Sequence, residues 1–355
     1  MKFGLFFFAE NPEEFRTPDT ENYQQALELT ELAEDLGFDQ VWTAEHHFDS
    51  QYPPNPFILC AAMAARTKRI RIGTNICILP LHHPLVVAEN AAMVDVLSNG
   101  RFDLGLGVGY EKTEFDTLDV PRKERGRRME EGLRSIIGLM TEEKFTFRGR
   151  HFHFNGVTML PRPVQKPHPP IWVAAEKRPT GDEIPPAIER AAKYGCHLTG
   201  PRDPNMLGPY DRALRKYGRE PGDYFRNVIR NCYVGETKEQ AWRDYAPHSL
   251  AQMRGYLPRY TEAGIFDTMA GEMFGRLPLP SAEELPAMAE SGEVHFLGKP
   301  FVVGTPDEVC RAIEEDRARG ITHFLAWMQI GGMDARKTRS SMKLFAKEVM
   351  PHFRD

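Results

Sequence analysis

The chain has 355 residues, of which 41% are hydrophobic and 27% are charged, and its formal net charge is −5. This composition favours a soluble globular protein with a large apolar core. The negative balance argues against nucleic acid as a partner, because phosphate binding needs clustered positive charge. Arg125, Arg127 and Arg128 do cluster, but glutamates surround them, so a solvated helix face explains them better.

The cysteines and the amino terminus indicate the compartment. The five cysteines are scattered without a CxxC pair, which favours reduced thiols in a cytoplasmic protein over disulfides or structural zinc. The apolar run 3–9 breaks at Glu10 with no small-residue cleavage site behind it, so a first strand is expected rather than a signal peptide. No apolar run approaches the roughly 18 residues of a membrane span, and no membrane partner is expected.

Short apolar runs alternate with segments of helical periodicity along the whole chain. The helix at 55–65 is typical, because Asn55 is a cap residue and Pro56 suits a first turn. Strands are expected at 2–9, 41–48, 70–78, 102–108, 171–175, 196–199, 227–234 and 322–328. Helices are expected at 22–36, 55–65, 85–97, 122–140, 184–194, 205–217, 237–254, 305–319 and 334–350.

This alternation predicts a parallel sheet, and eight units predict an α/β fold of the (β/α)8 TIM-barrel type. A doubly wound open sheet is the alternative. The whole chain, 1–355, is expected to form one domain with insertions at the carboxyl-terminal face of the barrel. Period-two alternation around a glycine predicts a hairpin near 145–154. Weak periodicity with frequent Gly and Pro predicts an insertion that serves as a lid near 255–300.

In such a barrel the active site lies at the carboxyl ends of the strands, and polar residues gather there in this chain. The second strand ends in Glu45, His46 and His47. Successive strand side chains point to opposite sides, so one of the two histidines faces any given site. A pair of adjacent histidines can also merely cap a loop, but polar groups at the other strand ends favour a site. These other groups are Glu10, 75–83, 107–110, 175–177, Gly200 and 329–332.

Two kinds of site are compatible with these strand ends. Glu45, His46, His47, His82 and His83 could supply nitrogen and oxygen ligands to a metal. Against this, the first strand carries no HxH, the sequence has no HExxH, and no obvious aspartate ends the last strand. The alternative is a flat cofactor that approaches the backbone closely where side chains are absent.

The glycines at 105, 107 and 109 favour the cofactor. They resemble half of a dinucleotide fingerprint, but the third glycine of G-x-G-x-x-G would fall at Tyr110. A charged loop instead of a helix is expected after Tyr110, so the chain does not fit the Rossmann pattern.

Five segments together resemble the bacterial luciferase-like, flavin-dependent monooxygenases, a TIM-barrel family. They occur in order over nearly the whole chain, and jointly they are highly specific. The segments are WTAEHHF (42–48), RIGTNICILPLHHP (71–84), NGRFDLGLGVGYEKTEF (99–115), QKPHPPIWVAAE (165–176) and VGTPDEV with ARGITHF (303–324).

The resemblance implies roles for individual residues. His46 corresponds to the catalytic histidine, and Asn75-Ile76 lies where luciferases have a cis peptide beneath the flavin ring. Backbone amides after the fourth and fifth strands, with a nearby threonine, are expected to hold the flavin phosphate. The cofactor-binding set implied in this way is Glu45, Asn75, Ile76, Gly107, Gly109, Tyr110, Ala175, Glu176, Lys177 and Thr180.

The chain departs from the luciferase pattern at three positions. Val108 stands where luciferase has a phosphate-clamping arginine, so the neutralising charge is expected from Lys177 or Arg178. Gly107 replaces a cysteine on the reactive face, and Lys177 replaces a serine. These changes bear on flavin affinity and light emission, while the scaffold is unaffected.

The resemblance implies that reduced FMN and molecular oxygen serve to insert one oxygen atom into a small organic substrate. A nicotinamide fingerprint is missing from the sequence, so a separate flavin reductase is expected to supply reduced FMN. A deazaflavin-dependent oxidoreductase, a non-catalytic flavin-binding protein and a metallohydrolase are the alternatives.

A homodimer is expected through the second and third helices, because residues 60–65 are small and apolar around the whole circumference of the helix. Close packing within one monomer explains the same residues.

Overall fold

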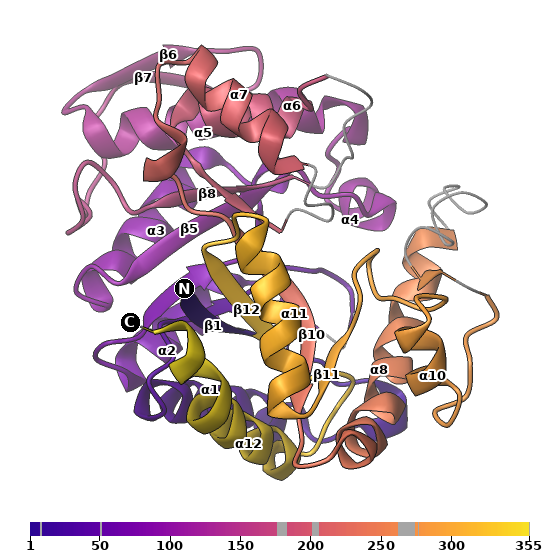
Figure 1. Cartoon of the computed structure of the whole chain (residues 1–355). Helices are drawn as coiled ribbons and strands as arrows, with labels where there is room; N and C mark the ends of the chain where they lie inside the picture. The colour runs from indigo at the N-terminus through magenta and orange to yellow at the C-terminus, as the bar shows by residue number, and fades with distance from the viewer. Residues whose placement is uncertain are drawn as a thin grey trace.

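The computed structural model describes residues 1–7, 9–49, 52–175, 183–200, 206–261, 274–275 and 277–354. Strands and helices alternate along them (Figure 1). The strands are β1 (Lys2–Phe7), β2 (Gln40–Thr43), β3 (Arg71–Thr74), β4 (Cys77–Ile78), β5 (Phe102–Gly107), β6 (Phe145–Arg148), β7 (His153–Val157), β8 (Ile171–Ala174), β9 (His197–Thr199), β10 (Asn227–Val234), β11 (Val302–Gly304) and β12 (His323–Trp327). The helices are α1 (Asp19–Asp35), α2 (Pro56–Arg66), α3 (Pro84–Leu97), α4 (Lys112–Thr117), α5 (Arg125–Thr141), α6 (Pro186–Tyr194), α7 (Leu207–Lys216), α8 (Lys238–Thr261), α10 (Leu285–Glu290), α11 (Pro306–Ala318) and α12 (Ala335–Leu344), with short 3₁₀ turns such as η3 (Arg122–Glu124) between them.

The main sheet is parallel and curled, and helices lie around its outer side (Figure 1). Its strand order is β11-β10-β12-β1-β2-β3-β5-β8-β9, and β4 pairs with β5. Gly4 of β1 is in register with Gln40 of β2 and with Leu325 of β12. Arg226, the residue before β10, forms a parallel bridge with Leu198 of β9, so the two flanks of the curl approach each other. The chain therefore has a mixed α/β fold like that of TIM-barrel proteins.

Alternation of side chains divides the apolar interior into two cores. Leu5 and Phe7 of β1 belong to the outer core, between the sheet and the helices, whereas Phe6 belongs to the inner core. The inner core is rich in aromatic residues, and small residues make room for them. A Cβ atom at Gly73 would lie 2.4 Å from the ring of Trp42, so a glycine is required at that point of β3.

Three elements differ from the expectation. The single strand expected at 70–78 is divided into β3 and β4, and the cis peptide between Asn75 and Ile76 lies in the break. The charged loop expected after Tyr110 contains the short helix α4, so that expectation is wrong. Such a short helix has little stability of its own, and the burial of its apolar and polar side chains stabilises it instead. The strand β11 was not expected, since its three residues carry no periodic signal.

The two expected insertions are partly visible. The segment at 145–154 forms the antiparallel pair of β6 and β7. In the expected lid region, α8 continues to Thr261 and α10 follows, while 262–273 and 276 lie outside the described residues.

The two ends of the chain meet at one side of the molecule (Figure 1). The Met1 amine donates a hydrogen bond to the Phe353 carbonyl at 3.1 Å.

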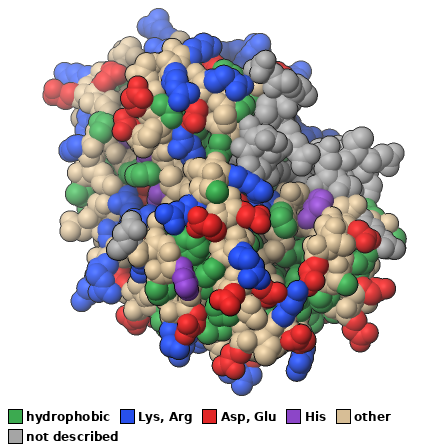
Figure 2. All heavy atoms as spheres, in the orientation of Figure 1, with side chains coloured by type: hydrophobic (Ala, Val, Ile, Leu, Met, Phe, Trp, Pro, Cys, Tyr) green, Lys and Arg blue, Asp and Glu red, His purple; other side chains and the backbone are tan. Residues whose placement is uncertain are grey.

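Among the described helices, none combines the length and apolar character needed to cross a membrane. Acidic and basic side chains are interspersed over the face shown in Figure 2.

Candidate active site

His46 follows β2 with its imidazole in the inner core. Trp42 and Ala44, two positions apart on the same side of the chain, belong to that core, and His46 is 7% exposed. Its Nδ1 atom lies 3.0 Å from Glu114 Oε1 and 3.6 Å from Glu111 Oε2. Both glutamates come from the α4 region, which the sequence analysis treated as a loop. The histidine singled out from the sequence is therefore paired with a buried carboxylate.

Glu114 is 1% exposed and interacts with both histidines. Its Oε1 atom also accepts a hydrogen bond of 2.9 Å from the backbone N–H of His47. Its Oε2 atom has no hydrogen-bond partner among the described residues. A buried carboxylate is costly without a compensating positive charge or donor. The N–H at Nδ1 of His46 is such a donor, so this pair holds the imidazole in one orientation for proton transfer.

Aromatic side chains border His46 on its other sides. The Tyr110 hydroxyl lies 3.5 Å from His46 Nε2, and the Tyr52 ring meets the imidazole edge-on with centroids 5.0 Å apart. Edge-to-face contacts continue from Tyr52 to Tyr256 of α8, and from there to Phe296, in the region between α8 and β11. The surroundings of His46 are thus apolar apart from the carboxylates and the phenols.

The Glu45 carboxylate points away from His46, as alternation along an extended chain requires. Its Oε1 atom accepts hydrogen bonds from His47 Nε2 at 2.7 Å and from His82 Nε2 at 2.6 Å, and its Oε2 atom accepts one from the Ile78 N–H at 2.9 Å. Burial alone would raise the pKa of this carboxyl, but the histidine and amide donors lower it to about 2. The same hydrogen bond raises the pKa of His47. Glu45 therefore ties the end of β2 to the segment that follows β3.

Asn75 and Ile76 lie next to this network, and the peptide between them is cis, which confirms what the resemblance implied. The Glu45 N–H donates to the Ile76 carbonyl at 3.2 Å. Asn75 Oδ1 accepts from the Thr199 hydroxyl at 2.9 Å, whereas Asn75 Nδ2 is buried without a hydrogen-bond partner in the described part of the chain. Gly107 leaves space for Ile76, because a Cβ atom at Gly107 would lie 2.8 Å from the Ile76 side chain.

The remaining predicted cofactor residues divide into two groups. Gly109, with a φ of 69°, turns the chain after β5, where a side chain would be strained, and presents Tyr110 toward His46. Ala175 is fully buried after β8, and its N–H donates to the Thr199 carbonyl at 3.4 Å. The other predicted residues, Glu176, Lys177, Arg178 and Thr180, lie outside the described residues.

The five residues considered as metal ligands fall into separate places. Glu45, His47 and His82 are joined at hydrogen-bond distances. His46 instead contacts the two glutamates of the α4 region. His83 stands apart, since its Nδ1 atom accepts the 3.3 Å hydrogen bond that caps α3. The geometry does not bring these five side chains to one point.

Sequence reasoning missed Glu111 and Glu114, although a signal was present. Two glutamates spaced i, i+3 directly after the turn of β5 lie on one face if that segment is helical. The segment was expected to be a loop because its periodic pattern is only six residues long. The missed side chains are the ones that hold His46.

The arginines at the start of α5 make more contacts than a solvated face would. Arg125 donates from Nη1 to the Arg122 carbonyl at 3.0 Å, and burial together with the Arg122 charge lowers the pKa of Arg125. Arg122 Nε is buried without a hydrogen-bond partner, and among the described residues neither guanidinium forms an ion pair with a carboxylate. Arg128 packs over the ring of Phe152 and donates to the Pro80 carbonyl at 2.8 Å. Arg127 is exposed, as a solvated face requires, whereas Arg125 and Arg128 are half-buried and make specific contacts.

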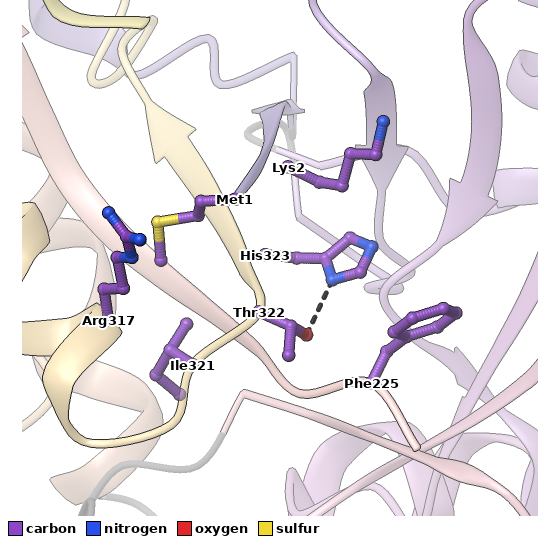
Figure 3. A pocket seen from close by; sticks show the side chains of 7 residues that line it. All are labelled: Met1, Lys2, Phe225, Arg317, Ile321, Thr322 and His323. Atoms are coloured by element: carbon purple, nitrogen blue, oxygen red, sulfur yellow. Dashed lines mark hydrogen bonds between the residues drawn. The ribbon is translucent and has the colours of Figure 1, made fainter. Parts of the chain in front are cut away.

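A pocket of about 330 Å³ opens at the opposite end of the strands (Figure 3). It lies where β1 and β12 begin, and burial lowers the pKa of its histidine, His323, to about 3. Active sites of parallel α/β folds lie at the carboxyl ends of the strands, so this pocket is not the candidate site. Its lining residues are Met1, Lys2, Phe225, Arg317, Ile321, Thr322 and His323.

Known proteins are similar to this chain in sequence and in fold. The oxygenase component of a flavin-dependent trigonelline monooxygenase from Acinetobacter baylyi is 28% identical over 99% of this chain and 96% of its own length. The crystal structure of the monooxygenase RslO1 from Streptomyces bottropensis is 30% identical, covers 100% of both chains and superposes with a TM-score of 0.81. The oxygenating constituent of 3,6-diketocamphane monooxygenase from Pseudomonas putida, solved in complex with FMN, is 20% identical over 99% of this chain and 98% of its own, with a TM-score of 0.78.

The family model described as luciferase-like monooxygenase matches residues 1–323. This match covers the strand ends that hold the His46 site. The chain therefore belongs to the luciferase-like monooxygenase family and is an oxidoreductase.

Proposed function

We propose that this protein uses reduced FMN and molecular oxygen to oxygenate a small organic substrate at the carboxyl ends of its strands. The observation that carries the proposal is the buried pair of His46 and Glu114 beside Asn75 and Ile76. A relative that aligns with 99% of this chain and 96% of its own length is named as a flavin-dependent oxygenase component. Bound reduced FMN would supply the electrons that activate oxygen, and the protein would orient the reactants.

Two features of the described residues fit a flavin. Asn75 Nδ2 is a buried donor without a partner, as expected where a ligand carbonyl completes the hydrogen bonding. Gly107 leaves the space that the Ile76 side chain fills, so it fixes the position of the Ile76 backbone, against which we expect the flavin ring to lie. Ile76, Gly107 and the amides after β8 are the groups that we expect to contact FMN.

The phosphate of FMN needs positive charge, and Val108 supplies none. Arg122 and Arg125 are two adjacent cations without a carboxylate partner in the described part of the chain. The turn η3, which carries Arg122, contacts α4 and so lies near the His46 site. We propose that this pair, together with Lys177 or Arg178, supplies the positive charge that neutralises the phosphate.

The protein's own part in the reaction is the handling of protons and the exclusion of water. Glu114 holds His46 at Nδ1 and orients the imidazole, so Nε2 is the atom that can donate or accept a proton. The aromatic side chains around His46 keep water away from the reacting atoms.

The arrangement of the elements supports a closed (β/α)8 barrel in one domain. The bridge between Leu198 and Arg226 and the 3.1 Å hydrogen bond from the Leu198 N–H to the Phe225 carbonyl join β9 to the start of β10. Tyr256 precedes the 262–273 segment and Phe296 follows it. The Tyr256 ring packs against Tyr52 and against Phe296. This contact supports a lid formed by the 255–300 region.

Two further features concern partners. A separate flavin reductase would supply reduced FMN, as the printed name "oxygenase component" of the Acinetobacter relative suggests. Such a pair of enzymes would work in the cytoplasm, where reduced nicotinamides and flavins are available.

The outer faces of α2 and α3 support a homodimer. Ile58 of α2 is 69% exposed, and Met93 and Leu97 of α3 are 51% and 58% exposed. Met93 and Leu97 are four residues apart, so they lie on one face of α3. Contiguous exposed apolar side chains mark interaction surfaces, and two copies of such a face can cover each other.

The test is an anaerobic titration of the protein with reduced FMN and, separately, with a reduced deazaflavin. FMN is expected to bind more tightly. Gly107→Ala should push on Ile76 and weaken FMN binding by about 10- to 100-fold, since overpacking costs about 1–3 kcal/mol. Gly222→Ala is the matched control, because nothing lies within 4 Å of a Cβ atom there. Tighter deazaflavin binding, or equal FMN binding in both variants, would contradict the assignment.

A further inference from the structure

The phenol of Tyr110 lies at the ring nitrogen of His46 that Glu114 does not contact. Its oxygen is 3.5 Å from His46 Nε2, and the two rings meet edge-on with centroids 5.8 Å apart. Gly109 allows this placement, because its φ of 69° turns the chain directly after β5. The resemblance had implied only a backbone role for Tyr110, so its side chain has no role assigned by that resemblance.

The hydrogen bonds around Glu114 define which nitrogen carries the proton. Glu114 Oε1 accepts the His47 N–H at 2.9 Å and lies 3.0 Å from His46 Nδ1. An ionised carboxylate oxygen can only accept hydrogen bonds, so the proton between Glu114 and Nδ1 belongs to Nδ1. Nδ1 is therefore the protonated nitrogen of a neutral imidazole. His46 Nε2 is then the basic atom, and it faces the Tyr110 hydroxyl.

We propose that Tyr110 relays protons between His46 and the reactants, which makes it a catalytic residue of the proposed oxygenation. The relay rests on that proposed function. The phenol O–H bond breaks as its proton passes to an acceptor among the reactants, and the proton on Nε2 of the imidazolium moves to the phenol oxygen. The imidazole becomes neutral, Glu114 stays ionised, and the reverse sequence returns a proton from the reactants. No electron is transferred in this step.

The distance and the surroundings agree with a relay. A separation of 3.5 Å is long for an O–H···N hydrogen bond, but catalytic hydrogen bonds often tighten when the reactants bind. Among the described residues, the carboxylates that contact the imidazole, Glu111 and Glu114, lie on its Nδ1 side. A proton leaving Nε2 therefore moves away from the carboxylates and toward the phenol.

Tyr52 provides a matched control inside the same site. Its ring also meets the imidazole edge-on, with centroids 5.0 Å apart, so Tyr52→Phe and Tyr110→Phe each remove one hydroxyl and keep one ring contact. A role in packing alone predicts the same small effect for both variants. A relay predicts a large effect for Tyr110→Phe only.

The first measurement uses the flavin-free protein. Nitrogen-15 NMR of the His46 imidazole should show a protonated Nδ1 and a basic Nε2, and the Nε2 resonance should move in Tyr110→Phe and stay in place in Tyr52→Phe. An Nε2 resonance that is unchanged in Tyr110→Phe would overturn the contact and the relay with it.

The second measurement mixes protein loaded with reduced FMN with oxygen and follows the return of oxidised flavin. Tyr110→Phe should slow this step by about 10²-fold, the lower end of the usual effect of acid–base groups, while its affinity for reduced FMN is unchanged. A wild-type rate in Tyr110→Phe overturns the relay alone. A wild-type protein that neither binds reduced FMN nor alters its reaction with oxygen overturns the proposed function instead.

Discussion

His46 and His47 are neighbours in the chain, but the groups that hold them differ. Glu114 contacts His46 at Nδ1, in the inner core. His47 is turned outward, where its Nε2 atom donates to Glu45. Alternation along an extended chain is enough to explain this division. The sequence could predict that one histidine faces the site, and the choice of His46 is consistent with the structure.

The first prediction is that His46→Ala abolishes proton transfer without unfolding the protein. His46 is buried against the Glu114 carboxylate, so its removal should cost about 1–3 kcal/mol, which is less than the usual total stability of a domain. The oxygen reaction of bound reduced FMN should slow by about 10²–10⁴-fold, the usual contribution of a positioned acid or base. His47→Ala, the matched control, should slow it less. Binding of reduced FMN is measured alongside, and a larger loss from His47→Ala would reverse the assignment.

The second prediction concerns stability at low pH. The pKa of Glu45 is lowered from 4.5 to about 2 in the folded protein, so its contribution is full above pH 4.5 and is lost as the pH falls toward 2. This difference corresponds to on the order of 3 kcal/mol. Urea unfolding at pH 5.5 and at pH 3 should show the loss in the wild type and much less of it in Glu45→Gln. An equal loss in both proteins would show that Glu45 does not couple folding to protons.

The polar partners of these residues were harder to predict than the residues themselves. His46 and the pair Asn75-Ile76 stand in recognisable motifs. Glu114 reaches His46 from 68 positions away, through a helix whose own pattern is too short to detect. Contacts of this kind depend on tertiary packing, which sequence periodicity does not encode.

At the scale of elements, the long helices and buried strands were predictable from their periodicity. The helix α2 begins at Pro56 after the Asn55 cap, as expected, with Asn55 Oδ1 accepting from the Phe57 N–H at 3.0 Å. Boundaries were less predictable. The helix expected at 22–36 begins at Asp19, after a proline that gives no side-chain cap. The division of the third strand was not predicted, although the resemblance implied the cis peptide that lies in the break.

The third prediction is that the outer faces of α2 and α3 pair two copies of the chain. Leu97→Glu places a charge on the exposed apolar face at the end of α3 and should yield a monomer, because an unpaired charge in an interface is costly. Leu118→Glu, at another exposed leucine, is the control and should leave the association unchanged. Light scattering at micromolar concentration measures the mass. A monomeric wild type would rule out this interface.

At the scale of the whole molecule, a second network joins the strands of the main sheet to the helix α8. Glu10, after β1, accepts from Gln252 of α8 at 2.7 Å and from the Gly331 N–H after β12. Gln252 in turn accepts from Asn231 of β10 at 2.8 Å. These side chains are buried, so α8 is held against the strand ends. The sequence placed Glu10 and Gly331 at the strand ends but contained no sign of their contact.

The most direct test of the proposed function is the reaction of the protein, loaded with reduced FMN, with oxygen in a rapid-mixing experiment. A closed site that excludes water protects reactive species from decay. Oxidised FMN should form more slowly from reduced FMN bound to the wild-type protein than from free reduced FMN in the same buffer. His46→Ala should change this rate while the affinity for reduced FMN stays the same. Return of oxidised FMN at the rate of the free flavin, in a protein shown to bind it, would contradict the account.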